Sequence, residues 1–358
     1  MADAYQPQPA GEPELVPVLA AHRIDNEALT TYLSSALEGF TGPLTIRQFQ
    51  GGQSNPTYHL QATSGTYVLR KKPPGILLPR AHAVEREYRI LAALAQTDVP
   101  VPPVRLLCAD ESVIGTPFFV MDHIGGRVFP DRVMRTGTPA ERSAIYEDLA
   151  RVLAVLHRVD WHAAGLADFG RPENYLARQV ALWTRQWEAA SVEEMPAMEW
   201  LARWLPEHLP PDEPATIAHG DYRLGNVLIH PTEPRIVGVL DWELSTIGQP
   251  LADLGYACLT YHFSEGPDSA AGVAGEDLTG TGIPDERAFV ASYCRHLGRE
   301  RPASLDIFLV FSLFRLASIG AGVYRRGLDG NASDSRAGTF RDRYRRLAAV
   351  GMELAQRI

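Results

Sequence analysis

The sequence predicts an α+β protein with two lobes, a small lobe built on an antiparallel sheet and a larger, mainly helical lobe. Three observations lead to this prediction. Apolar residues make up 45% of the 358 residues and charged residues 22%, which is enough apolar material for two hydrophobic cores. Short alternating runs dominate the first third of the chain, whereas helical spacing dominates from about Gly125 onward. No internal repeat of fixed period is visible.

The N-terminal part of the chain forms the predicted sheet lobe. Residues 1–22 are rich in proline, alanine and glutamate without periodicity, and we expect a mobile tail or an extended arm there. Residues 23–122 then make up the small lobe. Apolar spacing predicts helices over 26–38 and 83–95, and alternation bounded by turn residues predicts strands over 44–50, 57–63, 66–71, 104–107 and 118–121.

Residues 123–358 make up the predicted larger lobe. Helical spacing recurs along it, for instance over 140–159 and 292–297, and one strand pair is embedded at 227–229 and 236–240. Two lobes of this kind leave a cleft, and clefts are where small molecules bind. We therefore expect a ligand site between the two predicted lobes.

Composition excludes several classes of protein. With 34 Lys and Arg against 43 Asp and Glu, the net charge of −9 would repel a phosphate backbone, so we expect no nucleic-acid partner. Cys108, Cys258 and Cys294 are widely separated, which speaks against a disulfide framework or a thiolate zinc site. The apolar run 308–314 stops at Arg315, short of the roughly 20 residues of a bilayer span. We expect a cytoplasmic protein with no membrane contact.

Several common catalytic motifs are missing from the sequence. The only lysines are the adjacent Lys71 and Lys72, and no glycines precede them as a Walker A loop requires. The sequence also lacks H-E-x-x-H, G-x-S-x-G and an intact G-x-G-x-x-G after a strand. The usual signals of zinc proteases, serine hydrolases and dinucleotide-binding folds are therefore absent.

One motif carries the chemistry of phosphoryl transfer. His219, Asp221 and Asn226 lie on a loop that leads into a strand, and Asp241 follows the next strand fifteen residues later. Two carboxylates and one amide are thus expected at neighbouring strand ends. One carboxylate can orient an attacking hydroxyl, while the second carboxylate and the amide oxygen are hard ligands of the kind that Mg²⁺ prefers.

H-G-D-x-x-x-x-N followed by D-W-E resembles the catalytic and metal-binding motifs of the aminoglycoside phosphotransferase and choline kinase superfamily, relatives of protein kinases. The resemblance extends over residues 46–340 and includes the order of elements. It is strongest to the kinase-like domain that accompanies certain acyl-CoA dehydrogenases, in the stretches 68–75, 81–88 and 241–248. It implies a bilobal protein-kinase-like fold, with nucleotide binding in the N-terminal lobe and catalysis in the C-terminal lobe.

The resemblance also implies roles for individual residues, with ATP and Mg²⁺ as cofactors. Asp221 would be the catalytic base, and Asn226 and Asp241 would be the metal ligands. His219 would brace the catalytic loop, and Asp253 resembles a helix-start aspartate that hydrogen-bonds this loop. We therefore expect a structural role for His219 and Asp253.

Strand alternation limits which cation can bind the nucleotide phosphates. Val68, Arg70 and Lys72 share one face of a strand. The resemblance places an apolar residue two positions before the cation, which fits Val68 with Arg70; Lys72 is the alternative. Glu85 and Glu87 compete as the partner carboxylate, and on a helix they face roughly 200° apart, so only one can point toward the cation. We favour Glu87, which stands in the register R-E-x-x-x-L of the family.

Two further segments are expected to contact the nucleotide. Gly51, Gly52 and Ser54 lie between the first two strands of the small lobe, where glycines let backbone N–H groups approach phosphate. The run 118–124, which includes His123, leads from the sheet to the helices. We expect its backbone to hydrogen-bond adenine.

The acceptor is a small molecule that carries a hydroxyl group. Arg315, Arg325 and Arg326 belong to an arginine-rich C-terminal region and are the candidate substrate residues. They favour an anionic acceptor, such as a hydroxyacyl-CoA or another acidic alcohol, over a polycation.

Three other functions stay open. The first is an aminoglycoside or choline-type phosphotransferase, and the second is a nucleotide-binding pseudokinase without turnover. The third is a metal-dependent phosphoesterase with His219, Asp221, His230 and Asp241 as ligands. We favour the small-molecule kinase, because Asp221, Asn226 and Asp241 are all present.

Overall fold

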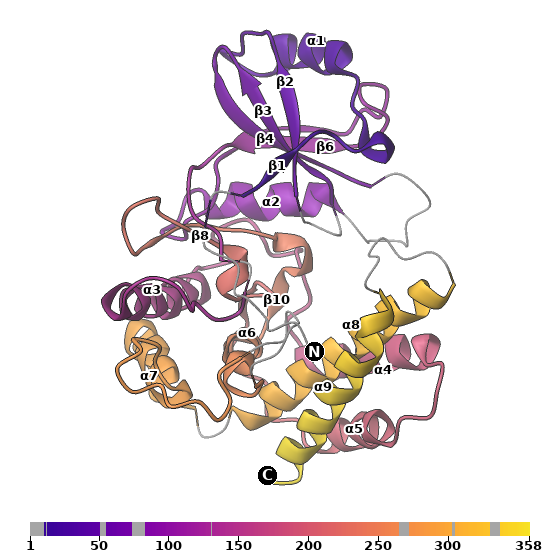
Figure 1. Ribbon diagram of the computed structural model, residues 1–358, viewed down its shortest axis with the longest axis vertical. Helices are drawn as coiled ribbons and strands as arrows, with labels where there is room; N and C mark the ends of the chain where they lie inside the picture. Colours follow the sequence, from indigo (N-terminus) through magenta and orange to yellow (C-terminus); the bar gives the residue numbers. More distant parts are fainter. Residues whose placement is uncertain are drawn as a thin grey trace, which may run out of the picture. The chain divides into compact units, whose positions relative to one another are not determined.

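The computed structural model describes residues 11, 13–50, 55–73, 83–129, 131–264, 272–302, 305–329 and 337–358. Over these residues the chain combines an antiparallel sheet with many helices, and the predicted α+β fold class is confirmed (Figure 1). The chain divides into two compact units. Of the described residues, those within 11–128 and 226–245 form what we call the sheet unit, and those within 129–225 and 246–358 form the helical unit. The chain therefore enters the sheet unit twice.

The sheet unit is built on six strands that pair antiparallel throughout, in the order β1-β2-β3-β4-β6-β5. The strands are β1 Leu15–Val16, β2 Thr45–Phe49, β3 Thr57–Ala62, β4 Gly65–Lys71, β5 Val104–Cys108 and β6 Phe118–Asp122. The unit also contains α1 (Asn26–Ala36), α2 (Val84–Leu94) and the hairpin of β8 (Val227–Ile229) and β9 (Ile236–Val239). All these elements except β1 lie close to their predicted bounds.

Of the segment 1–22, for which a mobile tail or an extended arm is predicted, the structure describes residues 11 and 13–22, and part of it forms an extended strand. Leu15–Val16 pairs with β2, at the edge of the sheet. Arg47 of β2 also donates from Nη2 to the carbonyl of Leu15 at 2.6 Å. The reason is general: a sheet edge offers unpaired backbone groups, and an extended neighbouring segment can satisfy them.

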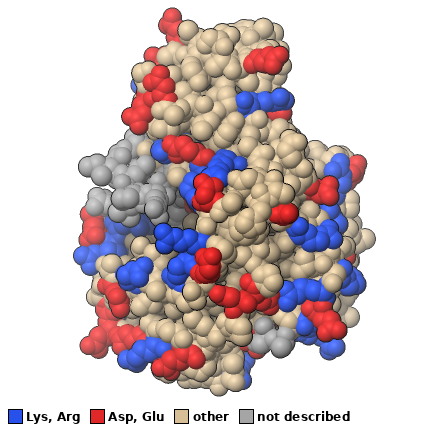
Figure 2. Space-filling view, turned by 180° about the vertical axis from the view of Figure 1, so that it is seen from behind, with Lys and Arg blue, Asp and Glu red and all other residues tan. Residues whose placement is uncertain are grey.

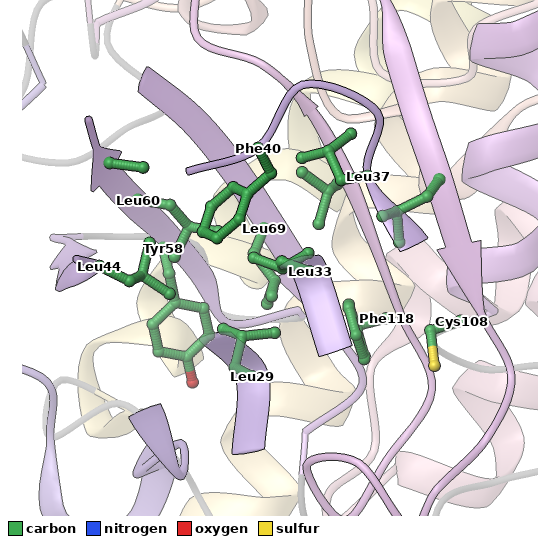
Figure 3. Packing of buried hydrophobic residues seen from close by; sticks show 13 residues of the cluster. Leu29, Leu33, Leu37, Phe40, Leu44, Tyr58, Leu60, Leu69, Cys108 and Phe118 are labelled. Carbon is green, nitrogen blue, oxygen red and sulfur yellow. The ribbon is translucent and has the colours of Figure 1, made fainter. Parts of the chain in front are cut away.

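One face of the sheet carries the core of the sheet unit. Along β3, alternation buries Tyr58 and Leu60 and leaves Gln61 exposed. Leu29 and Leu33, one turn apart on α1, are fully buried in the same cluster. Figure 3 shows these side chains packed between the sheet and α1. Burial of each large side chain stabilises the fold by about 1.5–3 kcal/mol relative to exposure.

The helical unit consists of helices and one short strand pair. The helices are α3 Pro139–His157, α4 Tyr175–Ala190, α5 Pro196–Glu207, α6 Pro250–Cys258, α7 Glu286–Leu297, α8 Asp306–Leu328 and α9 Phe340–Ala355, and the strands are β7 Thr216–Ala218 and β10 Thr246–Gly248. Helix α7 begins six residues before the predicted 292–297, because Asp285 caps it by accepting from the N–H of Ala288 at 2.7 Å. Gly298, at φ 75°, ends it.

Helix α8 continues through Arg315, where the apolar run was expected to stop. By length and composition this helix of 23 residues could cross a membrane, but 67% of its most apolar window is buried inside the chain. It packs there against α4, α6 and α9. The apolar residues of α8 therefore contribute to the core of the helical unit.

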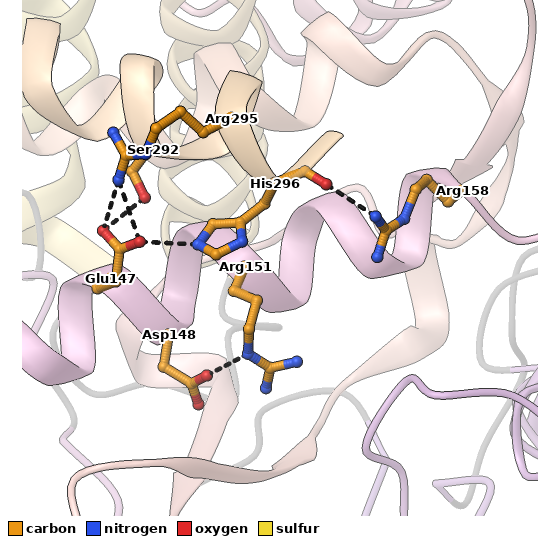
Figure 4. A network of polar contacts seen from close by, with 7 residues as sticks. All are labelled: Glu147, Asp148, Arg151, Arg158, Ser292, Arg295 and His296. Atoms are coloured by element: carbon orange, nitrogen blue, oxygen red, sulfur yellow. Dashed lines mark hydrogen bonds and ion pairs between the residues drawn. The ribbon is translucent and has the colours of Figure 1, made fainter. Parts of the chain in front are cut away.

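A polar network joins α3 to α7 (Figure 4). Glu147 of α3 accepts hydrogen bonds from Ser292 at 2.7 Å and from Arg295 at 3.1 Å, and its carboxylate lies 2.7 Å from Nε2 of His296. Arg158 donates to the carbonyl of His296 at 2.8 Å. The network fixes α7 against α3 at the surface of the helical unit.

Candidate active site

The sheet unit contains a pocket of about 240 Å³ that is open to solvent. Apolar side chains make up most of its wall, among them Val68 of β4, Met121 of β6, and Leu228 and Val239 of the β8–β9 hairpin. An apolar pocket with a few convergent polar groups is the usual form of a small-molecule site. The polar groups here include Arg70, which lines the pocket together with Val68.

Arg70 is the cationic centre of this pocket. Its Nη2 donates to Oδ1 of Asp241 at 2.7 Å, and its Nε lies 2.9 Å from Oε2 of Glu87. Asn55 donates to the other oxygen of Glu87 at 2.7 Å. The Nε–H group of Arg70 is buried but is not aimed at Glu87, and no described residue accepts a hydrogen bond from it. A buried, unsatisfied guanidinium N–H fits an anionic ligand such as phosphate.

The carboxylates around Arg70 outnumber it. Burial, together with the negative charges of Asp241 and Glu243, raises the pKa of Glu87 to about 7 against the opposing effect of Arg70. Burial would lower the pKa of Arg70, but Glu87 and Asp241 keep it above its ordinary value. The pocket therefore carries an excess of negative charge at this point.

Lys72, the alternative phosphate-binding cation, contacts a different acid. Its Nζ donates to Oε1 of Glu85 at 2.7 Å. Lys71, on the opposite face of β4, lies with its Nζ 5.7 Å from the ring centre of Tyr58. Arg70–Glu87 and Lys72–Glu85 are thus separate ion pairs, and of these four residues Arg70 and Glu87 line the pocket.

Asn226 and Asp241, the predicted metal ligands, lie at neighbouring positions of the sheet unit. Asn226 precedes β8, Asp241 follows β9, and the N–H of Leu240 donates to the carbonyl of Asn226 at 2.8 Å. Asp241 adopts φ 66°, a left-handed conformation that costs energy for a residue other than glycine. One amide oxygen and one carboxylate suit Mg²⁺, which takes few protein ligands and completes its shell with water and phosphate.

Of the remaining residues predicted to contact the nucleotide, His123 lies within the described residues. His123 lines the pocket, and its ring stacks on that of Phe49 at 6.4 Å. Its backbone N–H donates to the carbonyl of Thr66 at 3.2 Å, and use of the backbone of residues 118–124 for adenine stays a prediction. Gly51, Gly52 and Ser54 lie outside the described residues.

Asp221, the predicted catalytic base, belongs to the helical unit and is surrounded there by arginines. Nε of Arg223 lies 3.6 Å from its Oδ1. Burial would raise the pKa of Asp221, but Arg223, Arg132 and a hydrogen bond from Tyr256 hold that pKa below its ordinary value. Tyr256 also accepts a hydrogen bond from Nη2 of Arg132 at 3.0 Å. The environment keeps this half-buried carboxylate ionised, as a proton acceptor requires.

Asp253 hydrogen-bonds the backbone of the loop that precedes Asp221. The carboxylate of Asp253 accepts from the backbone N–H groups of His219 at 2.6 Å and Gly220 at 2.8 Å. His157 of α3 lies 3.4 Å from the same carboxylate. The ring of His219 in turn accepts from the N–H of Asp221 at 3.1 Å. These contacts are those of a structural brace.

The structure separates the three candidate substrate arginines. Arg315 is buried in the middle of α8, whereas Arg325 and Arg326 lie exposed near its C-terminal end. At 1.5 Å per residue, ten residues of helix place Arg315 about 15 Å from Arg325. Arg325 contacts Asp329 at 3.1 Å. Figure 2 shows basic and acidic side chains interspersed on the face that it draws.

Several residues of the site were not predicted from the sequence. Arg223 stands two positions after Asp221, within the quoted motif, and its spacing could have revealed it. Asn55, Arg132 and Tyr256 carry no such signal, because each reaches its partner across more than thirty residues of chain.

The pocket and the H-G-D loop occur in a chain that matches a known protein family. The family model of the phosphotransferase enzyme family matches residues 45–291, and the chain belongs to this family. The predicted kinase-like resemblance is therefore confirmed.

Among curated relatives, the chain is 42% identical over 359 residues to human acyl-CoA dehydrogenase family member 11, with 98% of this chain and 46% of the relative covered. It is 44% identical over 328 residues to mouse acyl-CoA dehydrogenase family member 10, with 91% of this chain and 31% of the relative covered. The chain thus spans less than half the length of these relatives.

Solved structures give the same result. A protein of Ralstonia eutropha provisionally described as an aminoglycoside phosphotransferase shares 45% identity and a TM-score of 0.85, over 94% of this chain and 99% of that chain. A spectinomycin phosphotransferase in complex with ADP and spectinomycin has a TM-score of 0.61 at 13% identity, over 92% of this chain and 99% of that chain. This second likeness shows the fold alone.

Proposed function

We propose that this protein is a small-molecule kinase, which transfers the γ-phosphoryl group of ATP to a hydroxyl group. The observation that carries the proposal is the arrangement of Arg70 between the buried Glu87 and the partly exposed Asp241 in an apolar pocket. Membership of the phosphotransferase family supports it, as does the presence of ADP in the structure of the spectinomycin phosphotransferase.

The sheet unit would bind the nucleotide. Val68 and Met121 line the pocket and would contact the base, and the orphan N–H of Arg70 would donate to a phosphate oxygen. Glu87 would hold Arg70 in place, since Asn55 fixes the other oxygen of that carboxylate.

Asn226 and Asp241 would hold Mg²⁺, whose positive charge supplies electrostatic stabilisation to the transferred phosphoryl group. The negative excess around Arg70 supports this assignment, because a divalent cation would offset it. Asp241 now accepts from Arg70, so this contact must weaken when the carboxylate binds metal.

The helical unit would supply the proton acceptor. Asp221 would accept a hydrogen bond from the acceptor hydroxyl and orient it for attack. Arg223 and Arg132 keep Asp221 ionised, and Asp253 and His219 fix its backbone. A pseudokinase would not require a half-buried carboxylate that is kept charged at this position.

The acceptor that we propose first is an acidic alcohol, such as a hydroxyacyl-CoA. The names of the curated relatives refer to acyl-CoA dehydrogenases, and the helical unit places arginines around Asp221. Aminoglycosides and choline are cations, and these arginines would repel them.

The test is a screen for ATP-dependent phosphorylation of hydroxyacyl-CoAs, hydroxy acids, aminoglycosides and choline by the wild-type chain. Transfer of the γ-phosphoryl group to an acidic alcohol is expected, with loss of transfer in Asp221→Asn. Asp110→Asn, which changes an exposed carboxylate of the sheet unit, is the matched control and should keep full activity. Binding of Mg-ATP without transfer to any acceptor would favour the pseudokinase.

A further inference from the structure

Arg315 is a buried cation without an acidic partner among the described residues. It is only 7% exposed, and its Nε has no hydrogen-bond acceptor in the part of the chain that the structure describes. Its guanidinium group lies against two aromatic rings. A buried charge is costly unless it is paired, so a guanidinium in this situation calls for an anion.

The aromatic rings hold Arg315 without neutralising it. Its Cζ lies 5.5 Å from the ring centre of Trp183 on α4 and 5.5 Å from that of Tyr256 on α6. Contacts with ring faces position a guanidinium through its flat surfaces and leave the N–H groups at its edge available as donors. The two rings therefore fix the position of Arg315, while its Nε–H has no acceptor in the described part of the chain.

Tyr256 connects Arg315 to the predicted catalytic base. The ring of Tyr256 contacts Arg315, and its hydroxyl group hydrogen-bonds Asp221. Asp221 cannot neutralise Arg315, because Arg223 and Arg132 already serve this single carboxylate. The buried guanidinium of Arg315 thus lies one tyrosine side chain away from Asp221.

We propose that Arg315 binds an anionic group, a carboxylate or a phosphate, of the same molecule whose hydroxyl is phosphorylated. The inference rests on the proposed function, since it takes Asp221 as the group that orients this hydroxyl. Trp183 and Tyr256 flank the subsite, and the substrate's anion supplies the counter-charge that the chain lacks. The acceptor is then anchored at its acidic end by Arg315 and presents its hydroxyl end to Asp221.

The experiment compares three series of acceptors with wild-type protein, Mg²⁺ and ATP. The probes are ω-hydroxycarboxylates of increasing chain length, the corresponding neutral diols, and ω-hydroxyalkyl phosphates. The carboxylate and phosphate series distinguish the two sources of the anion. The variants are Arg315→Met, which keeps the volume and removes the charge, and Arg315→Lys, which keeps the charge and removes the planar donor fork. Arg295→Gln, at an exposed arginine paired with Glu147, is the matched control.

We expect wild-type KM to be at least tenfold lower for one anionic series than for the diols, and Arg315→Met to abolish this preference. Arg315→Lys should retain part of it, and Arg295→Gln all of it. Calorimetry of the preferred probe, with a non-hydrolysable ATP analogue in place of ATP, should show the same loss of affinity without turnover. The melting temperature of Arg315→Met should stay at or above that of wild type, because an unpaired buried charge is removed.

Two results would overturn the inference. One is equal binding and turnover of acids, phosphates and diols by the wild-type protein. The other is a marked fall in melting temperature in Arg315→Met with the anion preference intact, which would give Arg315 a packing role. Either result leaves the proposed kinase standing as long as ATP-dependent transfer to a diol persists. Absence of transfer to every acceptor, together with absence of Mg-ATP binding, would instead refute the proposed function.

Discussion

The two units of the molecule surround their functional residues with charge of opposite sign. In the sheet unit, Arg70 is shared by Glu87 and Asp241, with Glu243 close enough to raise the pKa of Glu87. In the helical unit the ratio is inverted, because Asp221 is shared by Arg223 and Arg132. In the sheet unit, carboxylates outnumber the cation Arg70. In the helical unit, cations outnumber the carboxylate Asp221.

This difference indicates what each unit needs from its ligands. Buried charges are stable when they are paired, so an imbalance points to a partner that comes from outside the chain. The sheet unit calls for a cation, and Mg²⁺ fits the amide and carboxylate oxygens of Asn226 and Asp241. The helical unit calls for an anion. The balance of charges in a site thus indicates the sign of the charge that its ligand supplies.

The largest expected effect is that of Asp221→Asn in the helical unit. The variant keeps the shape of the side chain but removes the charge that accepts the proton, so turnover should fall by roughly 10²-fold or more. Affinity for Mg-ATP, measured by calorimetry, should change little, because Asp221 does not line the pocket of the sheet unit. A folded variant with near-normal turnover would remove Asp221 from the mechanism.

In the sheet unit, Asp241→Ala removes one of the two proposed metal ligands. Mg²⁺-dependent ATP affinity should fall by about tenfold or more, since one charge-assisted contact is lost. The melting temperature should change only slightly, because Asp241 is partly exposed. Calorimetry at several Mg²⁺ concentrations measures the effect, with Asp110→Ala as control. Unchanged Mg-ATP affinity would break the assignment of a cation site to this unit.

Substitution of the cations of β4 distinguishes Arg70 from Lys72. Arg70→Gln should weaken ATP binding by about tenfold, because the N–H that has no acceptor in the described structure would no longer be present. Lys72→Gln should change affinity by less than about threefold, since this residue pairs with Glu85 and an exposed pair contributes little. The two dissociation constants can be compared directly. A larger loss in the Lys72 variant would transfer the phosphate-binding role to Lys72.

The smallest expected effect concerns the pH dependence of turnover in Tyr256→Phe. Asp221 is faced by Arg223, Arg132, Tyr256 and His219, and together they hold its pKa low against burial. Without the hydroxyl donor the pKa of Asp221 rises, so the acidic limb of the kcat profile, where the base becomes protonated, moves to higher pH. Turnover at neutral pH should fall by no more than about tenfold. A profile identical to that of wild type would show that Tyr256 does not act on Asp221.

The sequence predicted the parts of the fold that depend on local order. Period-two alternation located β3 and β4, and it placed Val68 and Arg70 on the same face of the sheet. Helix α1 and the hairpin of β8 and β9 were also predicted close to their bounds. In each case the relevant residues lie within a few positions of one another, so spacing along the chain is enough.

The arrangement of charges was decided only by tertiary structure. Helix geometry left Glu85 and Glu87 as competitors for Arg70 and only the resemblance favoured Glu87, whereas packing of α2 against the sheet directs Glu87 to Arg70 and Glu85 to Lys72. The sequence contained no indication of Arg132 or Tyr256, which are 124 residues apart and join only because α6 is buried in the helical unit. Nor could it separate Arg315 from Arg325, since burial along one helix depends on what packs against it. Pairing of buried charges depends on distance in space and on desolvation, and both are set by contacts between residues far apart in the chain.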